Sequence, residues 1–257
     1  MRRLEAAYHS TRHRIVDLLA EVDTGRDPKR VAVPACPEWS VHGVISHVTG
    51  LCADVLCGNI AGAAKPEWTT TQVATRRDLS TAQVLDEWDH NGPNLAALLD
   101  DFPGRYGHQV LADLGVHEHD LRGALGRPAA RDSEAVHHAL EFIVTTLLDA
   151  GATALGLGPV EIRTEDGRWV VGTGDPRRGD AQAAFATAVA SLPPAERPSR
   201  PPVIASLDVS GFELFRAATG RRSRAQIRRY CWTADPDGYL ELFDLWPFRL
   251  RDDDLVE

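Results

Sequence analysis

The sequence predicts a mostly α-helical protein with a smaller α+β part, arranged as a helical domain over residues 1–155 and an α+β domain over residues 156–257. Apolar residues recur at spacings of three and four throughout the first part, which is typical of helices that bury one face. The run from Gly156 to Pro159 breaks this pattern, and alternating residues around a short turn follow it. A chain of 257 residues can bury a core in each of two such domains.

Five helices are expected in the first part. They cover residues 3–23, a segment that begins at Ser40, residues 80–98, a segment that carries Asp113 and His117 and ends near Gly126 and Pro128, and residues 133–155. Residues 61–75 carry no motif, and we expect them to form a loop. These helices should pack their apolar faces on one another.

The second part is expected to alternate strands and helices. Its predicted elements are a hairpin of residues 160–164 and 168–171 around Asp166 and Gly167, an alanine-rich helix over 180–192, a strand over 203–209 and a short helix over 211–219. This order indicates a small α+β domain.

Composition excludes several classes of function. The formal net charge of −9 argues against general nucleic-acid binding, and no apolar run approaches the length of a membrane span. The first residues lead directly into a helical pattern without the apolar segment of a signal peptide, so we expect a cytoplasmic protein without membrane contact. The sequence leaves the oligomeric state open.

The cysteines point to neither a zinc ribbon nor a disulfide framework. No two cysteines form a Cys-x-x-Cys pair among the four in the chain, which are Cys36, Cys52, Cys57 and Cys231. A reactive thiol is one interpretation of each, but small buried thiols are the expected role.

Three polar residues form a candidate metal site. Asp113 and His117 lie four residues apart, so both project from the helix face that carries the neighbouring apolar residues. His47 lies beside the apolar stripe of the helix that begins at Ser40. Two imidazoles and one carboxylate are a ligand set for catalytic zinc that leaves a fourth position open, although nickel, iron or manganese could bind the same atoms. The alternative is a pair of core histidines with satisfied hydrogen bonds.

Three segments carry a resemblance to a known family. Residues 34–47 (PACPEWSVHGVISH), 113–126 (DLGVHEHDLRGALG) and 209–221 (VSGFELFRAATGR) resemble the maleylpyruvate isomerase family of mycothiol-dependent enzymes, and the resemblance covers nearly the whole chain. It implies an N-terminal DinB-like four-helix bundle that binds a divalent metal, followed by a small C-terminal α+β domain.

The resemblance also implies roles for individual residues. The family's ligands match His47, Asp113 and His117, although its carboxylate is typically a glutamate, so the metal would lie nearer the helix of Asp113 or bind less tightly. The spacing alone adds Asp120 as a candidate catalytic residue, because it follows His117 by three and could orient that ring. This orienting role suits Asp120 better than the role of a general base.

An arginine of the C-terminal domain is implicated in the family's activity. Arg221 is the matching residue and Arg222 is adjacent, so either could hold a substrate or cofactor carboxylate in a cleft between the domains. Both belong to a basic cluster of Arg216, Arg221, Arg222, Arg224, Arg228 and Arg229. The alternative for each is a solvated arginine in an ion pair.

The implied function is the activation of a thiol by a metal. A bound metal lowers the pKa of a thiol, so mycothiol could attack an electrophilic small molecule as a thiolate near neutral pH. The outcome would be isomerisation or thiol (S-)transfer. Two alternatives remain at this point: a metal-dependent hydrolase with water in the fourth position, and a non-enzymatic metal- or thiol-binding module.

Overall fold

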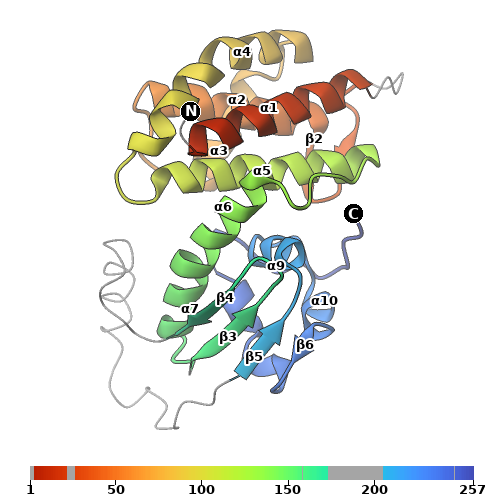
Figure 1. Cartoon of the computed structure of the whole chain (residues 1–257). Helices are drawn as coiled ribbons and strands as arrows, with labels where there is room; N and C mark the ends of the chain where they lie inside the picture. Colours follow the sequence, from red (N-terminus) through yellow and green to blue (C-terminus); the bar gives the residue numbers. More distant parts are fainter. Residues whose placement is uncertain (1–2, 22–26, 158, 173–204, 246) are drawn as a thin grey trace. The chain divides into compact units, whose positions relative to one another are not determined.

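The chain divides into two compact units (Figure 1). The structure, a computed structural model, describes residues 3–21, 27–157, 159–172, 205–245 and 247–257. One unit comprises Met1–Ala135 with Val256–Glu257, and the other comprises Val136–Leu255. The sequence predicted the boundary between residues 155 and 156. The second compact unit begins earlier than this boundary, because the helical segment after Ala135 packs with the sheet of that unit.

The first unit is helical, and its long helices share one apolar core. These helices are α1 (Arg3–Glu21), α2 (Val41–Leu56), α4 (Thr81–Leu98) and α5 (Tyr106–Leu125). The shorter α3 (Pro66–Thr75) packs beside α2, and η1 (Leu99–Asp101) extends α4. A small hairpin of β1 (Ala32–Val33) and β2 (Cys36–Ser40) precedes α2.

Local capping signals place the ends of these helices where the sequence predicts them. The Ser40 side chain caps α2 by accepting a hydrogen bond from the Gly43 backbone at 3.2 Å. Ser80 and Gln83 form a reciprocal capping box at the start of α4. Gly126 ends α5 with a φ of 64°, a left-handed conformation that glycine adopts without a Cβ penalty.

Apolar side chains fill the space between the helices. Among the largest side chains that are fully buried in this unit are Trp88, Ile15, Ile45, Leu95, Leu111 and Leu121. Burial of each such side chain contributes roughly 1.5–3 kcal/mol to folding. The indole N–H of Trp88 donates to the hydroxyl of Tyr8 at 2.9 Å, so this polar atom is satisfied inside the core.

The second unit begins with a long helical segment and continues into a sheet. Residues after Ala135 complete α6 (Glu134–Phe142), pass through a π-helical turn, η2 (Ile143–Leu148), and end in α7 (Asp149–Ala154). The sequence predicted one regular helix here. The π-helical turn changes the hydrogen-bond register within that segment.

The sheet has the strand order β4-β3-β5-β6. The predicted hairpin is confirmed as β3 (Val160–Arg163) and β4 (Arg168–Val171), paired antiparallel. β5 (Ala205–Asp208) runs parallel to β3, and β6 (Cys231–Trp232) pairs antiparallel to β5. The predicted short helix is α9 (Gly211–Ala218), and α10 (Arg224–Arg228), η4 (Pro236–Gly238) and η5 (Leu240–Phe243) follow.

Two expectations about local structure have other outcomes. The alanine-rich helix over 180–192 lies outside the described residues. The loop predicted over 61–75 is wrong because α3 occupies Pro66–Thr75. Among the described residues, no helix combines the length and the apolar composition that crossing a bilayer requires.

The cysteines differ in burial. Cys52 is buried as expected and Cys36 is partly buried, but Cys57 and Cys231 are exposed, so the expectation of buried thiols is wrong for these two. Burial raises the pKa of the Cys52 thiol to about 11.

We therefore expect iodoacetamide at pH 8 to alkylate Cys57 and Cys231 quickly in the folded protein and to leave Cys52 unmodified. Burial keeps the reagent away from Cys52, and the raised pKa keeps its thiolate scarce. Peptide mass spectrometry after timed quenching measures the rates, and denatured protein is the control in which all four thiols should react. Equal rates for Cys52 and Cys57 in the folded protein would contradict this burial.

Candidate metal centre

The three predicted ligands come together in the first unit. The Nε2 atom of His47, on α2, lies 3.4 Å from Oδ2 of Asp113, on α5. The Nε2 atom of His117, one helical turn after Asp113, lies 3.7 Å from its Oδ1. The centroids of the two imidazole rings are 4.9 Å apart, and the ring planes meet at 79°. These atoms belong to a group that could hold a metal ion.

The other nitrogen of each ring faces a hydrogen-bond acceptor. His117 Nδ1 lies 3.0 Å from Oδ2 of Asp120, and a carboxylate oxygen accepts hydrogen bonds. His47 Nδ1 lies 2.7 Å from Oε1 of Gln72, an amide oxygen that also accepts. In neutral histidines this arrangement assigns the proton to Nδ1 and leaves the lone pair on Nε2.

Two lone pairs and a carboxylate therefore converge on one point. A cation placed between the three groups would be attracted by all of them. Donor atoms about 2.1 Å from a tetrahedral metal lie about 3.4 Å apart, and each Asp113 oxygen lies at a similar distance from one of the two Nε2 atoms. The residues present thus fit a divalent metal, and the shorter aspartate reaches both histidines despite replacing the expected glutamate.

The centre is buried on its histidine side and open at its carboxylate. The side chains of His47 and His117 are 3% and 6% exposed, whereas that of Asp113 is 33% exposed. Trp39, on β2, adds an aromatic wall, with its ring 5.0 Å from His47 and 5.9 Å from His117. A fourth ligand could approach past Asp113.

A second group of possible metal ligands shares His117. The thiol of Cys36, on β2, donates to Oδ2 of Asp120 at 3.3 Å, and the same oxygen faces His117 Nδ1. Here the thiol and the ring N–H are donors and Asp120 is their acceptor, so the group is satisfied without a metal. The Nε2 side of His117 is therefore the better candidate metal position.

Asp120 acts on the centre through His117. It is 1% exposed and touches the ring nitrogen that points away from Asp113. This is the orienting contact that the sequence predicted, and it makes Asp120 a positioning residue. Its contacts with Cys36 and His117 disfavour a general base at this position.

Glu118, the residue after His117 on α5, is engaged in other contacts. Its side chain is fully buried, and its Oε1 accepts from Arg14 at 2.8 Å and from Arg122 at 3.0 Å. These two guanidinium groups supply the charge that a buried carboxylate requires.

Sequence reasoning missed Gln72, Trp39 and Cys36 as neighbours of the centre. Gln72 lies on α3, where three consecutive threonines weaken the helical pattern. A usable signal was present in Pro66 and Glu67, because proline at the first helical position and an acidic first turn are typical of a helix start. The contact from Gln72 to His47 is long-range and has no sequence signature.

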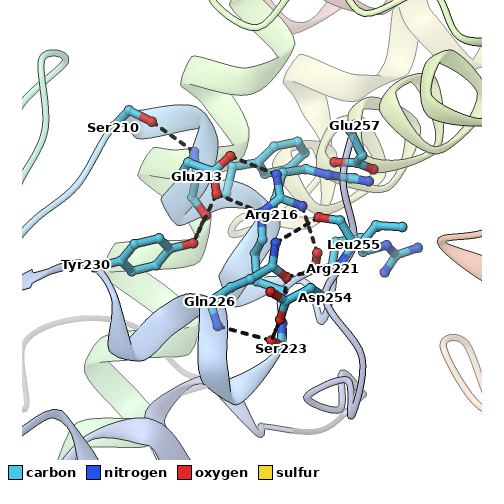
Figure 2. Close-up of polar contacts among 12 residues, drawn as sticks. Ser210, Glu213, Arg216, Arg221, Ser223, Gln226, Tyr230, Asp254, Leu255 and Glu257 are labelled. Carbon is cyan, nitrogen blue, oxygen red and sulfur yellow. Dashed lines mark hydrogen bonds and ion pairs between the residues drawn. The ribbon is translucent and has the colours of Figure 1, made fainter.

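The predicted arginines belong to the second unit. Arg222 donates to both carboxylate oxygens of Glu213, at 2.7 and 2.8 Å, and to the Arg221 carbonyl at 2.7 Å. Tyr230 also donates to Glu213, at 3.1 Å (Figure 2). Arg221 is 9% exposed and donates to the Thr219 carbonyl at 2.6 Å.

The exposed arginines of the basic cluster are in ion pairs. Arg224 pairs with Glu241 and Asp244, Arg228 with Asp237, and Arg229 with Asp254. Acidic residues from elsewhere in the second unit therefore offset this local positive charge, as the alternative interpretation predicted.

Two variants distinguish the two possible metal positions. Cys36→Ser should keep the zinc stoichiometry of the wild type, because the thiol is a donor to Asp120 and not a ligand. His47→Ala should lose most of the zinc. Elemental analysis after dialysis against a weak chelator measures both, and zinc lost from Cys36→Ser but kept by His47→Ala would assign the metal to the Cys36 side.

Arg222→Ala should lower the free energy of unfolding by about 1–3 kcal/mol, because it removes a buried guanidinium with charge-assisted bonds to Glu213. Arg229→Ala is the matched control: its side chain is 62% exposed, and it should change stability by under about 0.5 kcal/mol. Urea denaturation followed by circular dichroism compares them. Equal losses in both variants would refute a structural role for the buried pair.

Comparison of the chain with protein-family models, with curated proteins and with solved structures found no match in any of the three. The resemblance to the maleylpyruvate isomerase family therefore rests on the three sequence segments that carry it. The candidate metal centre stands on its geometry.

Proposed function

We propose that this protein is a metal-dependent enzyme that uses mycothiol as an isomerase or a thiol (S-)transferase. The observation that carries the proposal is the convergence of His47 Nε2, His117 Nε2 and the Asp113 carboxylate. Three donors and an open side are typical of catalytic zinc sites, whereas structural zinc sites are closed by four protein ligands. Zinc is the metal we propose first.

When bound, the metal would supply positive charge that lowers the pKa of a thiol in the fourth position. The chain's own residues prepare this position. His47 and His117 would each present a lone pair from a ring whose Nδ1 is already engaged. Asp113 would supply one negative charge and line the open side.

The thiol is the part of the proposal that the sequence resemblance supports. In isomerisation, the thiolate sulfur adds to one carbon of a conjugated double bond, which becomes a single bond and rotates. The C–S bond then breaks, the thiolate leaves and the double bond returns in the other geometry. In S-transfer the C–S bond is retained. The product is completed either by a proton that adds to the neighbouring carbon or by a leaving group that departs with the electron pair of its broken bond.

Arg221 is the proposed binding residue for a substrate carboxylate, and the sequence match to the family supports it. The adjacent Arg222 bonds to Glu213 through Nε and Nη2 and to a backbone carbonyl through Nη1. A planar guanidinium can hold a carboxylate through two parallel hydrogen bonds.

The hydrolase alternative needs a general base beside the metal-bound water. Glu118 and Asp120, the carboxylates that follow His117 on α5, are both buried in other contacts. A bound metal would lower the pKa of a water as well as that of a thiol, so it is the sequence resemblance that favours thiol chemistry.

The first test is elemental analysis of the wild type and of His117→Ala, followed by calorimetric titration with mycothiol. We expect about one zinc per chain in the wild type, its loss in the variant, and thiol binding that depends on the metal. Leu121→Ile, a core substitution one turn further along α5, is a control that should keep both. Zinc without thiol binding would contradict the thiol-dependent proposal, and a wild type that binds no divalent metal would contradict the metal site.

Arg221→Ala should keep the zinc and lower kcat/KM for a carboxylate-bearing substrate by roughly 10- to 100-fold, the size expected for a lost charge-assisted hydrogen bond. Arg224→Ala, an arginine already paired with acidic side chains, is the matched control. Circular dichroism checks that both variants fold. An unchanged kcat/KM in Arg221→Ala would exclude the proposed role.

A further inference from the structure

A chain of three polar side chains leads from the candidate metal centre to the far end of α2. Gln72 is 2% exposed, and its Oε1 lies 2.7 Å from His47 Nδ1. Its Nε2 donates to Oδ2 of Asp54 at 2.7 Å. Asp54 also accepts from the Asn59 amide at 2.8 Å, through its other oxygen. Each link has the length of a good hydrogen bond.

Asp54 decides which way the Gln72 amide points. A side-chain amide has a donor end and an acceptor end, whereas a carboxylate only accepts. The amide nitrogen must therefore face Asp54, which leaves the oxygen toward His47. The reversed amide would place an oxygen against a carboxylate oxygen, with two acceptors and no proton between them.

The direction of the amide in turn decides the tautomer of His47. An amide oxygen facing Nδ1 requires a proton on Nδ1, so in the neutral ring Nε2 keeps the lone pair that a metal needs. With the proton on Nε2, the ring would donate to the Asp113 carboxylate, 3.4 Å away, and could not be a ligand through that atom.

Gly50 makes this contact possible. A Cβ at this position of α2 would lie 2.6 Å from the Gln72 Cβ and 2.8 Å from its Cγ. These atoms are close to the backbone of α3, so the side chain cannot simply rotate away from a larger residue. Glycine lowers the helical propensity of α2, and here it allows α3 to approach closely.

We propose that Gln72, oriented by Asp54, is a positioning residue that holds His47 in the Nδ1–H tautomer and so presents Nε2 to the metal. Its effect on metal binding rests on the proposed function, but its effect on the tautomer does not. His117 receives the corresponding support from Asp120, a carboxylate, so the two ligand rings are fixed by groups of different charge.

The tautomer can be read directly in the metal-free protein. Long-range ¹H–¹⁵N correlation spectra of ¹⁵N-histidine-labelled protein at pH 8 distinguish a protonated ring nitrogen from a bare one. The His47 signals are assigned by their loss in His47→Ala. We expect Nδ1 to be protonated in the wild type and the population to shift to Nε2–H in Gln72→Leu. An unchanged tautomer in Gln72→Leu would overturn the proposal.

An exchange of partners provides a rescue. Gln72→Glu together with Asp54→Asn keeps an acceptor toward His47 and puts the amide donor at position 54, so the double variant should restore the Nδ1–H tautomer. Asp54→Asn alone permits both directions of the Gln72 amide and should give a mixture. Thr71→Ala, the exposed neighbour on α3, is the matched control and should leave the tautomer unchanged. A double variant with the Nε2–H form would also overturn the proposal.

Zinc affinity provides the second readout, measured by competition with a chromophoric chelator. Gln72→Leu should weaken zinc binding by about 10- to 100-fold, the usual effect of losing a group that orients a metal ligand. The double variant should recover to within about threefold of the wild type, and Thr71→Ala should match the wild type. Gly50→Ala should weaken binding through displacement of Gln72, even though alanine favours the helix.

The two readouts separate the two claims. Zinc binding by a wild type whose His47 carries its proton on Nε2 would refute the positioning role and leave the proposed metal site intact. The expected tautomers without zinc binding would refute the proposed function and leave the positioning role intact.

Discussion

The packing of α2 against α5 brings the Nε2 atoms of His47 and His117 to one carboxylate, and the rest of the centre depends on this approach. With both rings neutral and protonated on Nδ1, two lone pairs and a carboxylate meet at this place. Apolar burial along both helices supplies the free energy that holds the three groups together. A divalent cation at this place would be coordinated by all three groups.

Neighbouring elements prepare the ligands. The β1–β2 hairpin contributes Trp39 as a wall and Cys36 as a donor to Asp120, and α3 contributes Gln72. Each imidazole is thus held at its Nδ1, which limits rotation of the ring and selects its tautomer. Preorganisation of this kind is what a metal site needs if the folded chain is to bind metal without rearranging.

The sequence predicted the features that depend on short spacing. Asp113 and His117 share a face because they are four residues apart on one helix. Ser40 marks the start of the helix that carries His47, because its side chain caps that helix. His47 was found from its place beside an apolar stripe. Gln72 was not found, because its role comes from tertiary contact and its helix has a weak apolar pattern. The second compact unit begins before the predicted domain boundary for a similar reason: a helical pattern does not state which core a helix joins.

The most direct measurement of the central claim is zinc-edge X-ray absorption spectroscopy of the full chain loaded with zinc in the absence of thiol. Coordination by His47, Asp113 and His117 predicts nitrogen and oxygen scatterers at about 2.0–2.1 Å, with imidazole multiple scattering from two rings and no sulfur. A sulfur scatterer near 2.3 Å would place the metal at Cys36 and contradict the account.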